Sequence, residues 1–309
     1  MDSIYFLDHY GFFPYRRKSG KGAKPHISLR FNFGEVFDVH IDTYAGKGSS
    51  YINLITHAHS DHYGQYNLDN PNAIASQETA RMLSVLNGKR FIGRTFEIGK
   101  EIKLNGLRIK TYPTEHIFGS SAFLIESESR ILITGDVKDY RKLPRCDVLI
   151  TEATYGKPDF TFEEEIDKLI NEAKNSVLGV YPIGKAQRTA KILSENGYSV
   201  SGEDKITKLC KAFDIDVSNE GDVKLVSPRN LYSHSGRKYI LTAQRFYRIP
   251  RIVISDHLDF NGLIDMIEHC NPEHVIFYHG KPSEELLQRF RSSILKDFAV
   301  LSEEKLANS

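Results

Sequence analysis

The feature that most constrains this chain is a histidine-rich loop directly after an apolar segment, YINLIT, which ends at Thr56. The potential metal ligands in the next six positions are His57, His59, Asp61 and His62. Imidazole suits zinc, and a carboxylate among imidazoles adds negative charge that holds a dication. Such a loop can send alternating side chains to two ions, which lie about 3.5–4 Å apart in two-metal hydrolases. The pattern therefore predicts a two-metal site on a strand-to-helix loop.

Three further segments expected to be strands lead to residues that could also bind a metal. The strand that ends at Tyr112 leads to His116, the strand ILIT leads to Asp136, and the strand VIFY leads to His279. A glycine precedes Asp136 and another follows His279, which lets the backbone approach its neighbours closely. Each residue alone is equally well explained by a structural role. Together with the loop, they complete two coordination spheres.

The order of the expected elements indicates a mixed α/β fold. Strands are predicted over Ile27–Phe33, Val36–Ile41, Tyr51–Thr56, Leu107–Tyr112, Ala122–Glu126, Arg130–Thr134, Asp147–Thr151, Val177–Pro182, Lys224–Ser227, Tyr239–Thr242, Arg251–Ser255 and Val275–His279. Helices are predicted over Gln77–Leu86, Thr161–Ser176 with Thr161 as N-cap, Lys185–Asn196, Glu203–Phe213, Phe260–His269 and Ser283–Leu295. An α/β sandwich accounts for this order, with residues 1–182 and 251–309 forming one domain and residues 183–250 a small inserted cap.

The composition is that of an ordinary soluble globular protein, since 40% of the 309 residues are hydrophobic and 26% are charged. No segment approaches the ~20 apolar residues of a membrane span. The N-terminal segment has two aspartates before any lysine or arginine, unlike a secretory signal. We therefore expect a cytoplasmic protein without a membrane partner. Its cysteines, Cys146, Cys210 and Cys270, are expected to be reduced and buried.

Six motifs, in order, resemble the metallo-β-lactamase superfamily and, within it, the β-CASP nucleases. Four are HAHSDH, the strand-end histidine of TEH, the TGD and the late HG. The other two are EATYG, which follows DVLIT, and SDHLDF, which lies some twenty residues before the HG. The segment GKAQR resembles the compact DNA-ligase-associated exonuclease branch, close to the mRNA 3′-end-processing nucleases. The resemblance covers the chain from Asp42 to about Pro282.

This resemblance implies a four-layer αββα sandwich with a small β-CASP-like cap. It also implies a nuclease that hydrolyses phosphodiester bonds of DNA or RNA, as an exonuclease and on single strands. The weak preference for DNA comes from GKAQR alone. The cap of about seventy residues is short for this group, so the way in which the nucleic acid is gripped is left open.

The matching positions imply a centre of two zinc ions, in which manganese or iron could also serve. One zinc would be held by His57, His59 and His116, the second by Asp61, His62 and His279, and Asp136 would bridge them. Asp61 is counted among the catalytic residues as well. His257 would donate a proton to the leaving oxygen or contact the scissile phosphate, and Glu152 would hold its tautomer. Asp42 would brace the loop without binding metal, with Asp38 as the alternative brace.

Basic residues supply the candidate contacts to phosphate. Lys185 and Arg188 begin a helix after a glycine, where they would cradle a phosphate or simply be solvated. The basic and aromatic stretch from Arg237 to Arg251 suits single-stranded nucleic acid, or is a cap strand with solvated charges. The run from Arg16 to Lys24 is a phosphate-binding surface or a solvated loop. The net charge of +1 does not help to choose.

Three functions are compatible with these residues. The first is the nuclease, which alone uses all of the metal motifs, Glu152 and His257. The second is a small-molecule hydrolase, for example of thioesters or lactams, which needs the metals but not that pair. The third is an inactive subunit that binds nucleic acid or a partner nuclease. The remaining histidines, His26, His40, His234, His269 and His274, match no motif and are expected to have structural or surface roles.

Overall fold

A computed structural model of the chain describes residues 3–19, 22–23 and 26–302. The chain divides into two compact units. The first comprises residues 1–80, 90–159 and 257–309, and the second comprises residues 81–89 and 160–256. The second unit is thus wider than the insertion expected over residues 183–250, because it includes the helix and strand that precede Lys185.

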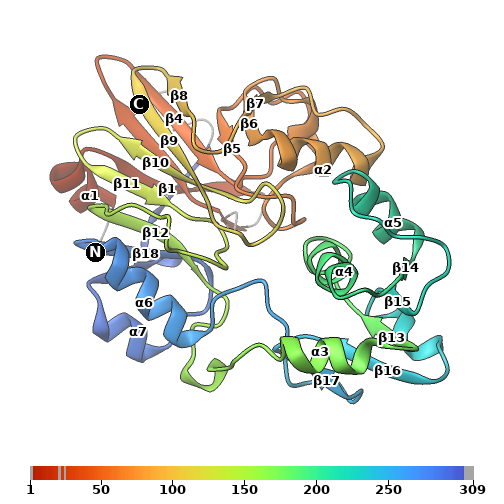
Figure 1. Cartoon of the computed structure of the whole chain (residues 1–309). Coiled ribbons are helices and arrows are strands. Elements are labelled where there is room, and N and C mark those ends of the chain that lie inside the picture. Colours follow the sequence, from red (N-terminus) through yellow and green to blue (C-terminus); the bar gives the residue numbers. More distant parts are fainter. Residues whose placement is uncertain (1–2, 20–21, 24–25, 303–309) are drawn as a thin grey trace. The chain divides into compact units, whose positions relative to one another are not determined.

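The first unit contains two sheets (Figure 1). Its eight-stranded sheet has the order β2-β1-β3-β4-β5-β6-β7, and β20 pairs with β1. The strands are β1 (Phe13–Ser19), β2 (Gly22–Ala23), β3 (Ser28–Asn32), β4 (Val36–Ile41), β5 (Asn53–Leu54), β6 (Ala73–Ser76), β7 (Arg94–Phe96) and β20 (Ala299–Leu301). The strands from β4 to β7 run parallel, so their carboxyl ends lie at one edge of the sheet.

The second sheet of this unit has seven strands in the order β19-β18-β12-β11-β10-β9-β8. They are β8 (Glu101–Leu104), β9 (Leu107–Pro113), β10 (Ser121–Glu126), β11 (Arg130–Ile133), β12 (Val148–Ala153), β18 (His274–Gly280) and β19 (Ser292–Ile294). The pairs β8–β9, β9–β10 and β10–β11 are antiparallel. From β11 through β12 and β18 to β19 the strands are parallel, which brings the ends of β11, β12 and β18 to one edge.

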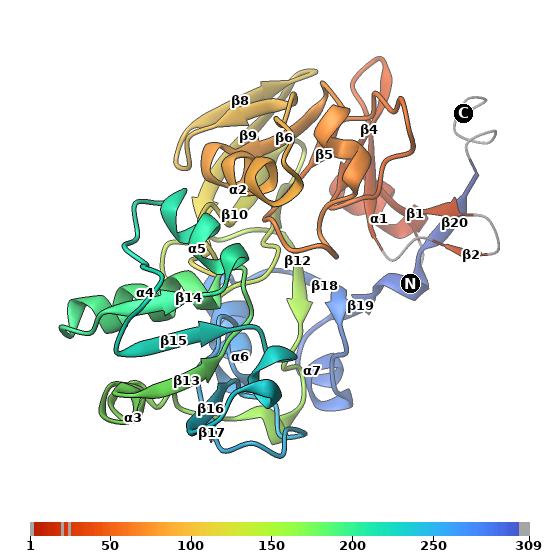
Figure 2. The same ribbon diagram turned by 90° about the vertical axis from the view of Figure 1, so that its right-hand side faces the viewer.

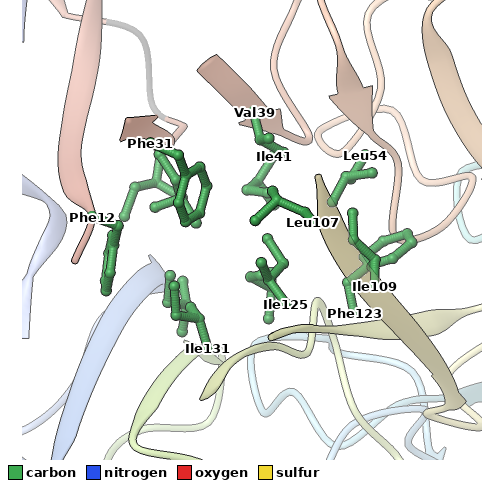
Figure 3. Close-up of a cluster of buried hydrophobic side chains, with 14 of the residues drawn as sticks. Phe12, Phe31, Val39, Ile41, Leu54, Leu107, Ile109, Phe123, Ile125 and Ile131 are labelled. Carbon is green, nitrogen blue, oxygen red and sulfur yellow. The ribbon is translucent and has the colours of Figure 1, made fainter. Parts of the chain in front are cut away.

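A shared apolar core joins these two sheets face to face (Figure 3). Phe31 and Ile41 come from the first sheet, and Phe123 and Ile131 come from the second. All four side chains are fully buried. Core residues on one strand are two positions apart, as Leu29 and Phe31 are on β3 and Phe123 and Ile125 are on β10, because alternate side chains of a strand point to the same face. Burial of this apolar area is the main force that holds the two sheets together.

The helices of the first unit include α1 (Ser3–Tyr10), α6 (Phe260–Cys270) and α7 (Glu284–Arg289), and α2 spans Gln77–Asn87. On α6, Phe260, Leu263 and Ile267 pack with buried side chains of β10 to β12 in a second apolar cluster. The α6 helix begins where the carboxylate of Asp259 accepts a hydrogen bond from the Gly262 N–H. It ends at Asn271 in a left-handed conformation, as helices commonly do. This packing fixes the chain just after residue 257.

The second unit is a five-stranded parallel sheet in the order β14-β15-β13-β16-β17 (Figure 2). Its strands are β13 (Ser176–Gly179), β14 (Val200–Gly202), β15 (Val223–Val226), β16 (Arg237–Leu241) and β17 (Arg251–Ile252). Its helices are α3 (Ile166–Ala173), α4 (Lys185–Glu195) and α5 (Asp204–Lys211). Apolar side chains of all three helices pack with those of the sheet in one cluster, which gives this unit a core of its own.

Two helices differ from their predicted extents. Thr161 is not an N-cap, since α3 begins at Ile166 and the residue before it is Glu165. The segment before α3 stays outside the helix because the Glu165 backbone and carboxylate both bond the backbone of Val253. The helix expected over Ser283–Leu295 ends at Arg289, and residues 292–294 form β19 beside β18. In both places, hydrogen bonds to a distant strand overrode the local preference for helix.

Of the other predictions from the sequence, some are confirmed and some are wrong. Arg16, Arg17 and Lys18 lie on β1 rather than in a solvated loop, and Arg17 is buried over the ring of Tyr51. Lys21 and Lys24 lie outside the described residues. All three cysteines are buried, as predicted. Within the described part of the chain, no helix has the length and hydropathy needed to cross a membrane.

Candidate metal centre

The histidine-rich loop follows β5, and hydrogen bonds to Asp42, at the end of β4, hold it in place. The Asp42 carboxylate is fully buried and accepts hydrogen bonds from the Thr56 N–H at 2.8 Å, the Thr56 hydroxyl at 2.9 Å and the Tyr278 hydroxyl at 2.9 Å. It also accepts from Nδ1 of His62 at 2.8 Å. Asp38, the alternative brace, instead pairs with Arg30 at 2.9 Å across β3 and β4. Asp42, rather than Asp38, thus contacts the ligand loop.

Three imidazoles and one carboxylate lie close together beside this loop. Nδ1 of His59 lies 3.1 Å from Nε2 of His57 and 3.0 Å from Nε2 of His116. Oδ2 of Asp136 lies 3.6 Å from the His57 nitrogen and 3.5 Å from the His116 nitrogen. Four ligands about 2.0–2.1 Å from a tetrahedral zinc ion are themselves about 3.3 Å apart. The group thus has donor atoms and a spacing that could hold a metal ion.

A second group lies on the other side of Asp136. Asp61, His62 and His279 bring their ligand atoms within 4.8 Å of one another. Oδ2 of Asp61 lies 3.5 Å from Nε2 of His279 and 3.9 Å from Nε2 of His62. The same Oδ2 of Asp136 that faces the first group is 3.6 Å from this His62 nitrogen. Asp136 is thus placed between the two groups, where a bridging ligand would lie.

Two buried atoms at this junction have no hydrogen-bond partner among the described residues, Nε2 of His62 and Oδ1 of Asp136. Because a carboxylate only accepts, His62 donates to Asp42 through Nδ1, and its Nε2 has a lone pair for a metal ion when the ring is neutral. Buried polar atoms are rarely left without a partner in folded proteins. A cation would satisfy both atoms, so the residues present fit the metal ions that the motifs imply.

The charges of the group favour a cation as well. Burial, together with the neighbouring imidazoles, keeps the pKa of His57 well below its usual value, so this ring is neutral and can bind a metal. Burial also opposes charge on His62, but the carboxylates of Asp136 and Asp42 raise the pKa of His62 to about 10. Burial and the nearby Glu152 raise the pKa of Asp136. Buried carboxylates here thus require positive charge, which a metal ion can supply.

Glu152 and His257 form a pair beside Asp136. Oε2 of Glu152 accepts from Nδ1 of His257 at 2.9 Å, and Oε1 of Glu152 accepts from the Val137 N–H at 2.7 Å. Burial opposes the charge of Glu152, but His257 and these hydrogen bonds hold the pKa of Glu152 below its usual value. His257 is 21% exposed, whereas Glu152 is 1% exposed. Glu152 therefore fixes the orientation of the partly exposed His257 ring through its Nδ1.

Two glycines allow the strands that carry these residues to approach so closely. Gly135 has φ +62°, and a Cβ there would lie 2.6 Å from Cβ of Thr56, at the start of the ligand loop. Gly280 has φ +80°, and a Cβ there would lie 2.3 Å from the backbone of Ala153. A shift in register at the end of β12 pairs Glu152 with His279. These close approaches bring the ends of β11, β12 and β18 to the ligand loop.

Lys185 and Arg188 lie in the second unit, on the first turn of α4. Lys185 is buried, and its ammonium lies 5.6 Å from the ring centre of Tyr181. Both Nη atoms of Arg188 donate to the carboxylate of Glu164 at 2.7 Å, and one also donates to the Ser255 carbonyl at 3.0 Å. The guanidinium thus holds the segment just before residue 257. Its predicted contact with phosphate stays a prediction, as does that of Lys185.

Sequence reasoning did not single out Thr56, Tyr278 or Glu164. Thr56 and Tyr278 together supply three of the four hydrogen bonds to Asp42. Each adjoins a predicted ligand, and that adjacency is the signal that could have identified them. Within the described residues, none of the five histidines without a motif belongs to a cluster that could hold a metal. Two of them bond a serine hydroxyl instead, His40 to Ser28 and His274 to Ser293.

Comparison with known proteins finds several relatives, although no family model matches the chain. A probable DNA ligase of Opitutus terrae is 24% identical over 299 residues, and the match covers 82% of this chain but only 29% of that protein. An uncharacterized protein from the lig 3′ region of Acidianus ambivalens is 32% identical over 114 residues, which cover 33% of this chain and 81% of that protein. The chain thus spans less than a third of the ligase it matches.

An endoribonuclease, ysh1 of Emericella nidulans, is 29% identical over 120 residues, which cover 33% of this chain and 14% of that protein. Among solved structures, a protein of unknown function from Enterococcus faecalis superposes with a TM-score of 0.66. The superposition covers 95% of this chain and 99% of that protein at 15% sequence identity. At that identity, the likeness concerns the fold alone.

Proposed function

Since this chain belongs to the metallo-β-lactamase superfamily and is related to its nucleases, we propose that it is a metal-dependent nuclease that hydrolyses phosphodiester bonds. The relatives named as an endoribonuclease and a DNA ligase support a nucleic acid as the substrate. The clusters of histidine and aspartate support a metal centre. We further propose that the enzyme acts as an exonuclease on single strands.

The observation that carries this proposal is the Glu152–His257 pair beside the metal clusters. Nδ1 of His257 lies 4.0 Å from Oδ2 of Asp136, so the imidazole adjoins the carboxylate that faces both clusters. A hydrolase of thioesters or lactams does not need an imidazole outside the metal clusters that is held by a buried glutamate. A phosphodiesterase does, because the leaving alkoxide of a phosphodiester needs a proton.

The roles of the metal ligands follow from the two clusters. We assign one ion to His57, His59 and His116, and the other to Asp61, His62 and His279, with Asp136 shared between them. Two zinc ions suit this donor set, and manganese is compatible with the carboxylates. When bound, the ions supply a nucleophile at neutral pH and neutralise charge on the phosphate. Asp61, 57% exposed, is the ligand most open to substrate.

The residues of the chain itself position the reacting groups. Asp42 holds the loop and fixes the tautomer of His62, so that Nε2 faces the second cluster. Glu152 fixes the tautomer of His257 in the same way. Nε2 of His257 then contacts the scissile phosphate or donates its proton to the leaving oxygen. Glu152 remains a carboxylate and stabilises the imidazolium before that transfer.

We assign the catalytic domain to the first unit and a β-CASP-like cap to the second. The two packed sheets, with α6 on the outer face of one of them, support a four-layer αββα arrangement for the first unit. The parallel sheet with its own core supports a separate inserted domain. In this assignment the cap is residues 160–256 rather than 183–250.

The test is cleavage of single-stranded DNA and RNA, each labelled at the 5′ or the 3′ end, with zinc or manganese supplied. We expect product ladders from one end, which also give the polarity and the preferred sugar. His257→Ala should reduce the rate by about 10²–10⁴-fold, the usual contribution of a positioned acid or base. The matched control is His269→Ala, an exposed histidine on α6 that bonds the Leu143 carbonyl. It should cut as fast as the wild type.

The measured metal content decides what a failure would mean. If the protein binds two metals but cuts no DNA or RNA of any end structure, the proposal is wrong. Equal cleavage by wild type and His257→Ala would remove the role of the pair while leaving the metal centre in place. Loss of activity in His269→Ala as well would mean that the substitutions act through folding.

A further inference from the structure

A group of three aromatic rings, two exposed and one partly buried, lies on the second unit, and we call it the aromatic surface. It consists of Tyr181, Phe246 and Tyr247. The hydroxyls of Tyr181 and Tyr247 are 3.0 Å apart, although these residues are distant in sequence. The rings of Phe246 and Tyr247 have centroids 4.4 Å apart and planes inclined by 32°. Phe246 is 69% exposed and Tyr181 is 43% exposed.

This surface is anchored rather than loose. The segment 242–250 connects β16 to β17, and its Ile249 is buried in a small apolar cluster with Leu231 and Ile240. The ring of Tyr247 packs against the same cluster. Tyr247 thus fixes the position of the segment, while its neighbour Phe246 extends outward. An exposed phenylalanine that packs only on a second ring contributes little to the core, which makes a binding role the better explanation.

The segment that carries Phe246 and Tyr247 is rich in positively charged residues. From residue 223 to residue 255 the chain has seven lysines and arginines and no aspartate or glutamate, although its net charge is only +1. Arg245 and Arg248, which flank Phe246 and Tyr247, are both exposed. Within the described residues, neither of them pairs with a carboxylate, whereas Arg237 in the same stretch pairs with Glu172. Lys185 lies over the ring of Tyr181. Both arginines are therefore available to a ligand.

Aromatic faces between unpaired cations fit one class of ligand especially well. Unpaired bases stack on aromatic side chains, and the phosphates between them pair with arginine and lysine. Every base has such a face, so this recognition tolerates any sequence. A duplex hides the faces of its bases and offers only its backbone and groove edges. The combination of exposed rings and cations thus distinguishes a single strand from a duplex.

We propose that the aromatic surface binds a single strand of nucleic acid, with a base stacked on Phe246 and phosphates held by Arg245 and Arg248. This proposal rests on the proposed function for its ligand, but it concerns residues outside the metal centre. It assigns to Tyr247 the role of positioning Phe246. It also makes the second unit a substrate-binding domain in its own right.

The test measures how tightly the full-length protein with metal binds a fluorescein-labelled oligothymidylate, with fluorescence anisotropy as the readout. The oligonucleotide has phosphorothioate linkages, which resist cleavage. Phe246→Ala should weaken binding by about 5- to 150-fold, since a stacked base contributes about 1–3 kcal/mol. Arg245→Gln combined with Arg248→Gln should lower the slope of log affinity against log salt by about 1.4, because each phosphate contact on a single strand contributes ~0.7.

Two matched controls lie in the first unit. Phe33 is 46% exposed and also packs beside another phenylalanine ring, so Phe33→Ala removes an equivalent ring elsewhere. Arg94 is exposed and begins β7, so Arg94→Gln removes an exposed arginine charge elsewhere. Both controls should bind the oligonucleotide like the wild type. Circular dichroism and metal content of each variant establish that it is folded.

Equal binding by wild type and Phe246→Ala would overturn the proposal. So would equal affinity for duplex and single strand, or an equal loss in Phe33→Ala. Hydrolysis of bis(4-nitrophenyl) phosphate by the wild type tests the metal centre separately, because that diester is too small to span a surface. Tight binding that depends on Phe246, in a protein that hydrolyses no diester, would support the surface and refute the nuclease.

Discussion

Replacing Asp42 with asparagine keeps the size of the side chain but removes its charge and one of its acceptors. All four partners of the carboxylate are donors: the Thr56 N–H, the Thr56 and Tyr278 hydroxyls, and Nδ1 of His62. An amide offers one oxygen, so in either orientation its NH₂ group meets at least one of these donors. The substitution thus leaves a buried donor without an acceptor.

The magnitude can be estimated from these contacts. A buried donor without a partner costs about 1–3 kcal/mol, and each remaining bond loses roughly 1 kcal/mol when its acceptor becomes neutral. Relief of the desolvated charge offsets part of this loss. We expect the free energy of unfolding of the apoprotein to fall by about 2–4 kcal/mol. Because the tautomer of His62 is no longer fixed, zinc affinity should fall about 10- to 100-fold.

Competition with a chromogenic chelator measures the zinc affinity, and guanidinium unfolding followed by circular dichroism measures the stability. The control is Asp38→Asn, the same chemical change four residues earlier on β4. Asp38 pairs with Arg30 near the surface, and such pairs contribute about 0–1 kcal/mol. Its substitution should leave the zinc affinity unchanged. If both variants bound zinc equally well, the reasoning that Asp42 organises the ligand loop would be refuted.

Three further substitutions test other contacts. Asp136→Ala removes the carboxylate between the two clusters and should abolish stoichiometric binding of two metals, which mass spectrometry of metals detects; two retained ions would exclude a bridging role. Gly135→Ala should lower the free energy of unfolding by more than about 2 kcal/mol, measured by guanidinium unfolding, whereas Gly106→Ala should lower it by about 1–2 kcal/mol. Both glycines have a positive φ, but only Gly135 lacks space for a Cβ. Glu164→Gln weakens the bidentate pair with Arg188 and should lower stability by about 1–3 kcal/mol in the same assay; an unchanged midpoint would show that the pair is not structural.

The ligand positions were open to prediction because each is marked locally. A ligand-type residue directly after an apolar strand lies at the carboxyl end of that strand, and parallel strands bring these ends to one edge. His116, Asp136 and His279 could therefore be expected near the loop from pattern alone. The mixed α/β class was predicted correctly for the same reason, since alternation of strands and helices is a local signal.

The parts that could not be predicted depend on distant partners. Nothing near Arg188 indicates that Glu164 holds its guanidinium. Tyr278 adjoins the predicted ligand His279, but nothing near it indicates that its hydroxyl donates to Asp42. The end of α7 at Arg289 is set by the pairing of residues 292–294 with β18 rather than by their own preferences. Such contacts join residues that are far apart in sequence, and single-sequence patterns do not report them.

The parallel pairing of β12 with β18 has a consequence for how the protein matures. During synthesis the loop, His116 and Asp136 leave the ribosome long before β18, which supplies His279 and pairs beside Glu152. Until that strand is inserted, a nascent chain has only part of its second ligand set. Strand insertion across so many residues is also intrinsically slow. With the proposed metal ions bound at both clusters, full metal loading would mark the completion of folding, and the ions would stabilise the finished molecule far more than any of its precursors.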